Sequence, residues 1–251
     1  MRPNSVSLVR AQAASIVPLV LRAIRKIRGV LFNVDADAVR GGIEAWLSQH
    51  PLRGATKRQA ALHEAGHLIA YEFDGMIAGK ACIEGSPFGR GSWGGGAWCI
   101  DTPNTTHGPC ANDPNEFLRE ARGVLAGAFA EAMLGDGDAL SSVGELAEAR
   151  FLTARAAEIL GHDKSDIWHE TLTETAAIVE RHASEIEEIA DLLMRRRRVN
   201  RFECSTGRIL TRVGREPIVP AALSMGSKEL AQLVETTVAR FVDMQWMGAH
   251  R

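Results

Sequence analysis

Apolar residues recur at helical spacing over four long stretches of the chain. The first opens with Thr56, whose hydroxyl suits a helix N-cap, and the second opens with Asp113 followed by a proline at the first helical position. Gly135 ends the second stretch, and Gly161 is placed to close the third. The predicted helices span residues 56–71, 113–134, 143–160 and 164–196.

The stretch between the first two helices lacks this spacing. Residues 80–83 and 97–100 are short runs of strand length, and residues 85–96 contain six glycines, which is typical of a loop or hairpin. We therefore predict a mostly α fold with a small β-sheet or hairpin. We also expect the open edge of this hairpin, near residues 93–100, to pair with an extended peptide.

Two tryptophans, Trp93 and Trp98, lie in or beside the glycine-rich stretch. Two interpretations are open for them. They either bind substrate in a cleft, or they only pack against the surrounding structure.

The first helix contains the sequence His63-Glu64-Ala65-Gly66-His67. Residues four apart lie on one face of a helix, so both imidazoles can reach one Zn²⁺ at about 2.0–2.1 Å. Glu64 follows the first histidine and is placed to take a proton from a zinc-bound water. The pattern predicts hydrolysis with Glu64 as general base, and the alternative is a core helix with two incidental histidines.

The composition is that of an ordinary soluble enzyme with one core. The chain has 251 residues, 45% hydrophobic and 24% charged, with a formal net charge of −2, which gives no indication of nucleic-acid binding. Its four cysteines are dispersed and contain no CxxC pair, which favours free thiols in a reducing compartment. No apolar run is long enough to span a bilayer. We therefore expect a cytoplasmic protein.

Residues 1–32 differ from the rest, since they carry six basic residues and no acidic one. Three alternatives are open: a basic amphipathic helix on a membrane surface, a transit peptide, or a helix packed on its own domain. The chain divides into an N-terminal helical extension (1–54), a catalytic domain (55–204) and a C-terminal hairpin and helix (205–251). The arginine run 195–198 is either a solvated helix end or a patch for a partner.

Three segments in the same order resemble the peptidase domain of the FtsH family of ATP-dependent zinc metallopeptidases. Residues 60–67 are nearly identical to the HEAGH helix of that family. Residues 125–131 are similar to its Gly-Gly-Arg-x-Ala-Glu-Glu helix, and residues 141–149 to its Thr-Gly-Ala-x-x-Asp-Leu-x-x-Ala-Thr segment. The resemblance covers about residues 56–200 and implies a zincin-like metallopeptidase.

The resemblance also implies a third zinc ligand. The family has an aspartate where this chain has Glu145, and His₂Glu sites bind zinc in other enzymes. Glu131 is the competing ligand, although a role in orienting a ligating histidine fits it better. A further alternative makes Glu145 an ordinary surface carboxylate near a helix start.

The ATPase module and the transmembrane segments of that family have no counterpart in this sequence, and no Walker motif is present. We therefore expect a zinc-dependent endopeptidase that hydrolyses unfolded or flexible polypeptides without ATP. Its expected partners are the polypeptide substrate and either a separate unfoldase or further copies of the chain. The alternatives are a non-cleaving binding or adaptor protein and a zinc hydrolase of a non-peptide bond.

Overall fold

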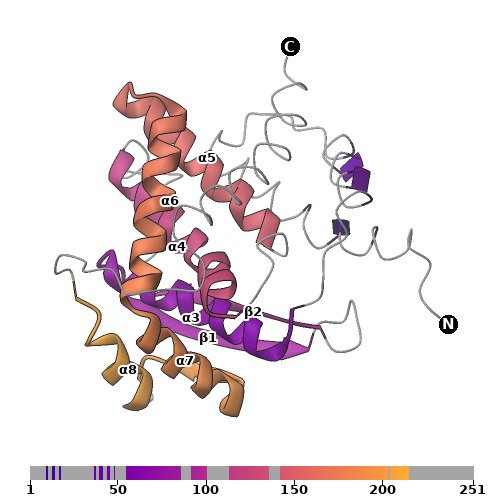
Figure 1. Cartoon of the computed structure of the whole chain (residues 1–251), viewed down its shortest axis with the longest axis vertical. Helices are drawn as coiled ribbons and strands as arrows, with labels where there is room; N and C mark the ends of the chain where they lie inside the picture. Colours follow the sequence, from indigo (N-terminus) through magenta and orange to yellow (C-terminus); the bar gives the residue numbers. More distant parts are fainter. Residues whose placement is uncertain are drawn as a thin grey trace.

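The computed structural model describes residues 55–85, 92–100, 113–135, 142–202 and 204–214, with scattered helical positions between 10 and 48. Helix α3 is central in this part of the chain, because it packs against α4, α7 and one face of a small sheet (Figure 1). The elements are α3 (Lys57–Phe73), β1 (Ala78–Gly85), β2 (Trp93–Cys99), α4 (Pro114–Leu134), α5 (Val143–Leu160), α6 (Lys164–Arg181), α7 (Ala183–Arg196), β3 (Arg198–Asn200) and α8 (Cys204–Leu210).

The mostly α class with a small sheet is confirmed, and local signals set the helix ends. The Thr56 side chain accepts a hydrogen bond from the backbone of Gln59, whose own side chain accepts one from the backbone of Thr56. Such a capping box is worth about 1 kcal/mol of helix stability. Asp113 caps α4, and Gly161 closes α5 in the left-handed conformation with φ of 69°.

The prediction of one helix over residues 164–196 was wrong, because the chain turns at His182 between α6 and α7. No glycine or proline marks this position. The turn lets the apolar side of α7 pack on α3 while α6 packs on α4. A straight continuation of α6 would carry the buried residues Ile186, Ile189 and Leu193 away from that core.

The sheet is antiparallel with strand order β2-β1-β3. The predicted hairpin and its open edge are confirmed, since β1 pairs with β2 and β2 has no second neighbour among the described strands. Both strands are longer than predicted. Strand β3 was not predicted. It has only three residues and begins with the last arginine of the run 195–198, so it is too short to show a period-two pattern.

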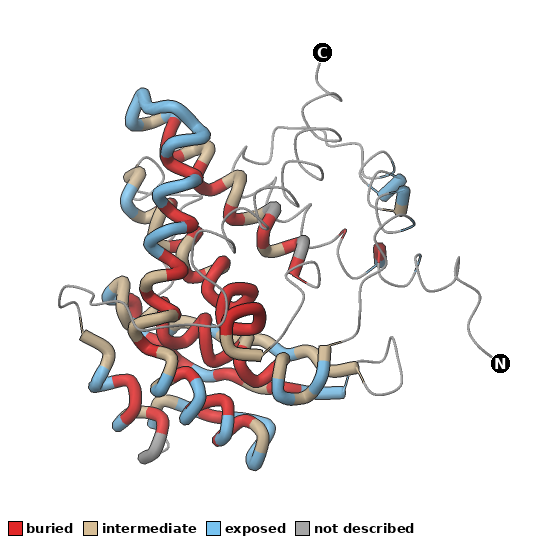
Figure 2. The backbone as a smooth tube through the Cα atoms, in the orientation of Figure 1, coloured by how far each residue is buried: buried red, intermediate tan, exposed pale blue. Residues whose placement is uncertain are grey.

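Small residues on α3 and α4 let the two helix backbones approach each other closely. The residues at this contact are buried and belong to the core (Figure 2). A Cβ added at Gly66 would lie 2.4 Å from the carbonyl oxygen of Ala126. Fully buried alanines on both helices continue the contact in either direction. The close approach places the side chains of α3 directly against the backbone of α4.

The predictions for the N-terminal extension (1–54) and for the C-terminal hairpin and helix (205–251) fall mostly outside the described residues. The described start of the C-terminal segment, up to residue 214, contains nearly all of α8. Within the described part of the chain, no helix combines the length and the apolar character needed to cross a membrane.

Candidate metal centre

Helix α3 presents the two motif histidines to one side. His63 and His67 are one helical turn apart, and their side chains are only 12% and 7% exposed. Their ring centroids are 4.7 Å apart. The spacing of the motif therefore brings two imidazoles into one buried location, as a metal site requires.

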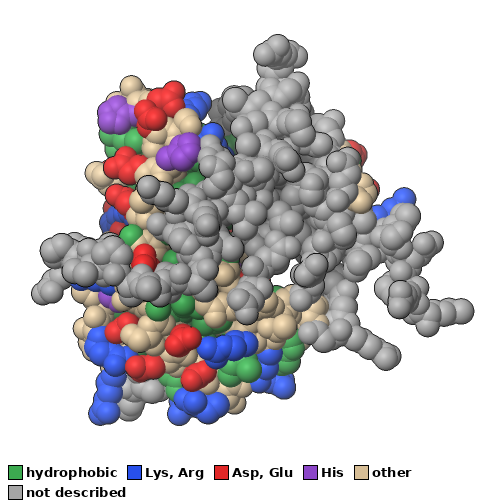
Figure 3. All heavy atoms as spheres, in the orientation of Figure 1, with side chains coloured by type: hydrophobic (Ala, Val, Ile, Leu, Met, Phe, Trp, Pro, Cys, Tyr) green, Lys and Arg blue, Asp and Glu red, His purple; other side chains and the backbone are tan. Residues whose placement is uncertain are grey.

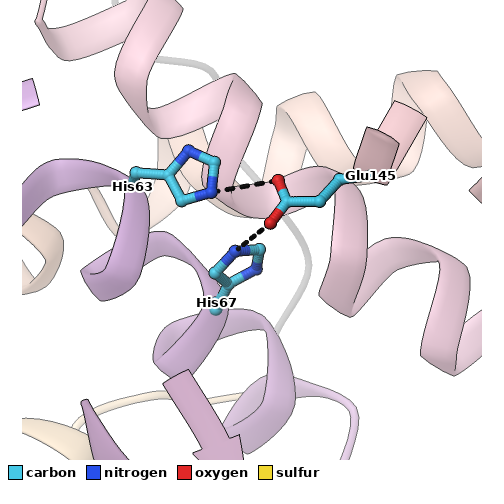
Figure 4. Close-up of side chains that lie close together, drawn as sticks. All are labelled: His63, His67 and Glu145. Atoms are coloured by element: carbon cyan, nitrogen blue, oxygen red, sulfur yellow. Dashed lines mark ion pairs between the residues drawn. The ribbon is translucent and has the colours of Figure 1, made fainter. Parts of the chain in front are cut away.

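Helix α5 supplies a carboxylate to the same location. The Oε2 atom of Glu145 lies 3.0 Å from Nε2 of His63, and its Oε1 atom lies 3.4 Å from Nε2 of His67 (Figure 4). One ligand atom from each of the three residues lies within 4.8 Å of the others, so the group could hold a metal ion. Oε2 of Glu145 is buried, and its contact with Nε2 of His63 is an ion pair without the geometry of a hydrogen bond.

The other ring nitrogens fix the orientation of both histidines. Nδ1 of His67 lies 2.7 Å from the carbonyl oxygen of Gly123, and must carry a hydrogen to donate there. Nδ1 of His63 lies 3.2 Å from Oε2 of Glu131, with Oγ of Ser142 at 3.4 Å. Both contacts favour the tautomer whose Nε2 lone pair points toward Glu145, which is the arrangement that metal-ligating histidines commonly show.

Space for an ion is preserved by Gly127 on α4. A Cβ at this position would lie 2.5 Å from Nε2 of His67 and 2.7 Å from Nε2 of His63. Any larger residue would therefore intrude on the two nitrogens that face Glu145. The donor set and the missing side chain together fit a small metal ion.

Charge couples the three residues strongly. Burial by itself lowers the pKa of both imidazoles, but the surrounding carboxylates together outweigh burial and raise the pKa of His63 and His67. Glu145 contributes most of this rise, Glu64 adds to it for both histidines, and Glu131 adds to it for His63. Burial opposes the charge on Glu145 as well, yet the two imidazoles hold its pKa far below its usual range. A divalent cation would take the place of the imidazole protons in balancing this carboxylate.

Glu64 lies beside the cluster and under the sheet. It is 4% exposed, and its Oε2 atom is buried without a hydrogen-bond partner in the described part of the chain. A Cβ added at Gly95 of β2 would be 2.8 Å from Oε1 of Glu64. Burial raises the pKa of Glu64 to about 7, against the lowering effect of the two imidazoles. The group can thus take up and release a proton near neutral pH.

The structure brings together His63, His67 and Glu145, with Glu64 and Glu131 beside them, but it separates the two tryptophans. Trp98 is paired with Lys80 and lies on the outer face of the sheet, away from α3. Trp93 lies on the inner side, between Lys57 and Arg197. The two rings therefore lie on opposite faces of the sheet.

Several contributors were missed by the sequence analysis. Gly123 contributes its backbone carbonyl, and Gly127 contributes the space left by its missing side chain. A motif defined by side chains reveals neither contribution. Tyr71, one turn beyond His67, stacks on it with ring centroids 6.2 Å apart. The sequence signal for these residues is their spacing: Gly123 and Gly127 are four residues apart on α4, and Tyr71 follows His67 by four residues on α3.

Comparison with known proteins adds no identification. No protein-family model matches the chain, and no curated protein is significantly similar to it.

Proposed function

We propose that this chain is a zinc-dependent endopeptidase that hydrolyses unfolded or flexible polypeptides, with a zincin-like fold similar to the FtsH family peptidase domain. The observation that carries the proposal is the convergence of His63, His67 and Glu145 beside a buried Glu64, whose Oε2 atom has no hydrogen-bond partner among the described residues. A cluster that only stabilised the fold would need Glu145 to pair with the two imidazoles, but it would not require a second buried carboxylate, Glu64, beside them.

The donor set supports zinc over harder cations. Two imidazoles and one carboxylate are ligands that Zn²⁺ accepts, whereas Mg²⁺ and Ca²⁺ prefer sites made of oxygen atoms. Three protein ligands also leave a position open for catalysis. When bound, zinc would polarise a carbonyl and lower the pKa of a water to about 7.

Glu64 is assigned the proton transfers. Its carboxylate would accept the proton of the attacking water and then donate it to the leaving nitrogen. Burial raises the pKa of Glu64 and so favours the acid that donates to the leaving nitrogen, whereas the two imidazoles and a bound cation would favour the carboxylate that accepts the proton of water. Glu131 and the Gly123 carbonyl would hold the imidazoles in place during both steps.

The open edge of β2 supports a polypeptide substrate. An extended chain paired with this edge would run past Gly95, whose inner side faces Glu64. The backbone hydrogen bonds of such pairing require an unfolded segment, so a folded domain would be a poor substrate. This placement would bring one peptide bond next to the metal ligands.

A Glu64→Gln variant tests the proposal when its zinc content and its cleavage of carboxymethylated, unfolded protein are measured together with those of the wild type. We expect one zinc per chain in both proteins and cleavage by the wild type alone, with inhibition by a chelator. Cleavage by Glu64→Gln at the wild-type rate would overturn the assigned base. A zinc-loaded wild type that cleaves no polypeptide would favour a non-cleaving binding protein, and hydrolysis of ester substrates alone would favour a non-peptide hydrolase.

A further inference from the structure

The outer face of the sheet carries a second cluster of chemistry that the metal centre does not use. Residues paired directly across antiparallel strands share a face. The pairs Lys80–Trp98, Lys80–Asn200 and Cys82–Arg198 therefore place all five side chains on the face opposite α3. The inner face carries Ala81 and Ile83, which are buried.

These side chains surround a hollow of about 300 Å³. It is lined by Lys80, Ala81, Cys82, Trp98, Arg198, Val199 and Asn200. Two cations, an indole and an amide thus face one space, and no carboxylate of the described residues lines it. Trp98 is 46% exposed, and Nζ of Lys80 lies 5.0 Å from the centre of its ring.

The arginine run at the end of α7 contributes one residue to this hollow. Arg198 begins β3 and lines the hollow, whereas the guanidinium of Arg197 lies 5.4 Å from the centre of the Trp93 ring, on the inner side of the sheet. At the end of the molecule formed by α7, α8 and the sheet, Lys and Arg side chains lie among Asp and Glu side chains (Figure 3). The positive charge of the hollow is therefore that of the two cations in its lining, Lys80 and Arg198.

We propose that this hollow is a docking site for an acidic segment of a polypeptide, whose Asp or Glu carboxylates pair with Lys80 and Arg198. The aliphatic part of such a side chain would pack on the Trp98 ring, and the amide of Asn200 would donate to the carboxylate. The proposal is independent of the peptidase assignment, because it uses none of the residues around the metal centre.

The shape of the site favours an acidic polypeptide over a nucleic acid. Non-specific binding of single strands uses a basic groove that follows the phosphates and several aromatic rings in succession. Here the two cations line one compact, partly open hollow with a single aromatic ring, and Nζ of Lys80 already lies near one face of that ring. Such a space fits one or two acidic side chains of a polypeptide.

Fluorescence anisotropy with a labelled peptide of eight alternating Glu and Ala residues tests the proposal. The protein carries Glu64→Gln, so that cleavage does not deplete the probe. We expect Lys80→Glu and Arg198→Glu each to weaken binding by about tenfold or more, and high salt to weaken it further. The charge-matched control Lys164→Glu, an exposed position at the start of α6, should change affinity by less than about twofold.

A second measurement places the peptide. Cys82 is a free thiol in the lining, so saturating peptide should slow its alkylation, measured by mass spectrometry at that residue. Binding that survives both charge reversals, or that leaves the alkylation rate of Cys82 unchanged, would overturn the proposal. Equal binding of the Gln-for-Glu peptide would do the same, and so would binding of a single-stranded octanucleotide without binding of the acidic peptide.

Discussion

The two faces of the small sheet carry charged groups under opposite conditions. On the inner side, Glu64 and His67 of α3 are buried and His63 is nearly so. The two imidazoles lower the pKa of Glu64, and Glu64 raises the pKa of both imidazoles. On the outer face, Lys80 and Arg198 are exposed, and water screens them. Burial, rather than the number of charges, therefore distinguishes the two clusters. The buried inner groups have shifted pKa values that suit proton transfer, and the exposed outer groups suit the binding of a charged partner.

The largest effect is expected from Glu145→Ala. Loss of one of three ligands should remove zinc and reduce cleavage on the order of 10³-fold or more, because the lost metal is worth several kcal/mol in the transition state. Zinc content and kcat/KM measure this effect. Glu158→Ala, an exposed site on the same helix, is the control. Full zinc occupancy in Glu145→Ala would exclude Glu145 as a ligand.

A smaller loss is expected from Gly127→Ala. The added methyl would lie 2.5 Å from Nε2 of His67, so the imidazoles must shift and zinc affinity should fall by about tenfold or more. Alanine favours a helix over glycine by about 1 kcal/mol, so poor helix formation would not explain the loss. Gly94→Ala, where the methyl meets open space, should retain wild-type affinity in the same zinc titration.

Glu131→Ala should weaken zinc binding by about 10–100-fold and leave the stoichiometry at one, because this carboxylate orients His63 without facing the ion. Competition with a zinc-binding dye measures the affinity. Glu131→Gln keeps an acceptor for Nδ1 of His63 and should recover most of the loss. A complete absence of zinc in Glu131→Ala would reverse the roles assigned to Glu131 and Glu145.

The smallest effect is expected from the outer face. Lys80→Glu and Arg198→Glu should leave zinc affinity unchanged within about twofold and change the free energy of unfolding by no more than about 0.5 kcal/mol, as exposed substitutions usually do. Zinc titration and urea denaturation check both quantities. A tenfold change in zinc affinity would show that the outer face affects the metal centre, and would contradict the independence of the two clusters.

Local patterns predicted much of this arrangement, and long-range packing accounts for the rest. Thr56 and the spacing of His63 and His67 act within one or two helical turns, so the sequence alone reveals them. Glu145 is far from the motif in sequence, and only the resemblance to a known family suggested it. The turn at His182 and the role of Gly127 depend on how helices cross. The turn has no glycine or proline to mark it, and the four-residue spacing from Gly123 to Gly127 gains a meaning only once α4 is packed against α3.

X-ray absorption at the zinc edge on the purified protein tests the zinc assignment at His63, His67 and Glu145. We predict one zinc per chain, with two imidazole nitrogens at about 2.0–2.1 Å and a carboxylate oxygen among its ligands. In His67→Ala, one imidazole should be lost from the zinc ligands. Sulfur ligands at about 2.3 Å, or a wild-type protein that takes up no zinc, would contradict the assignment.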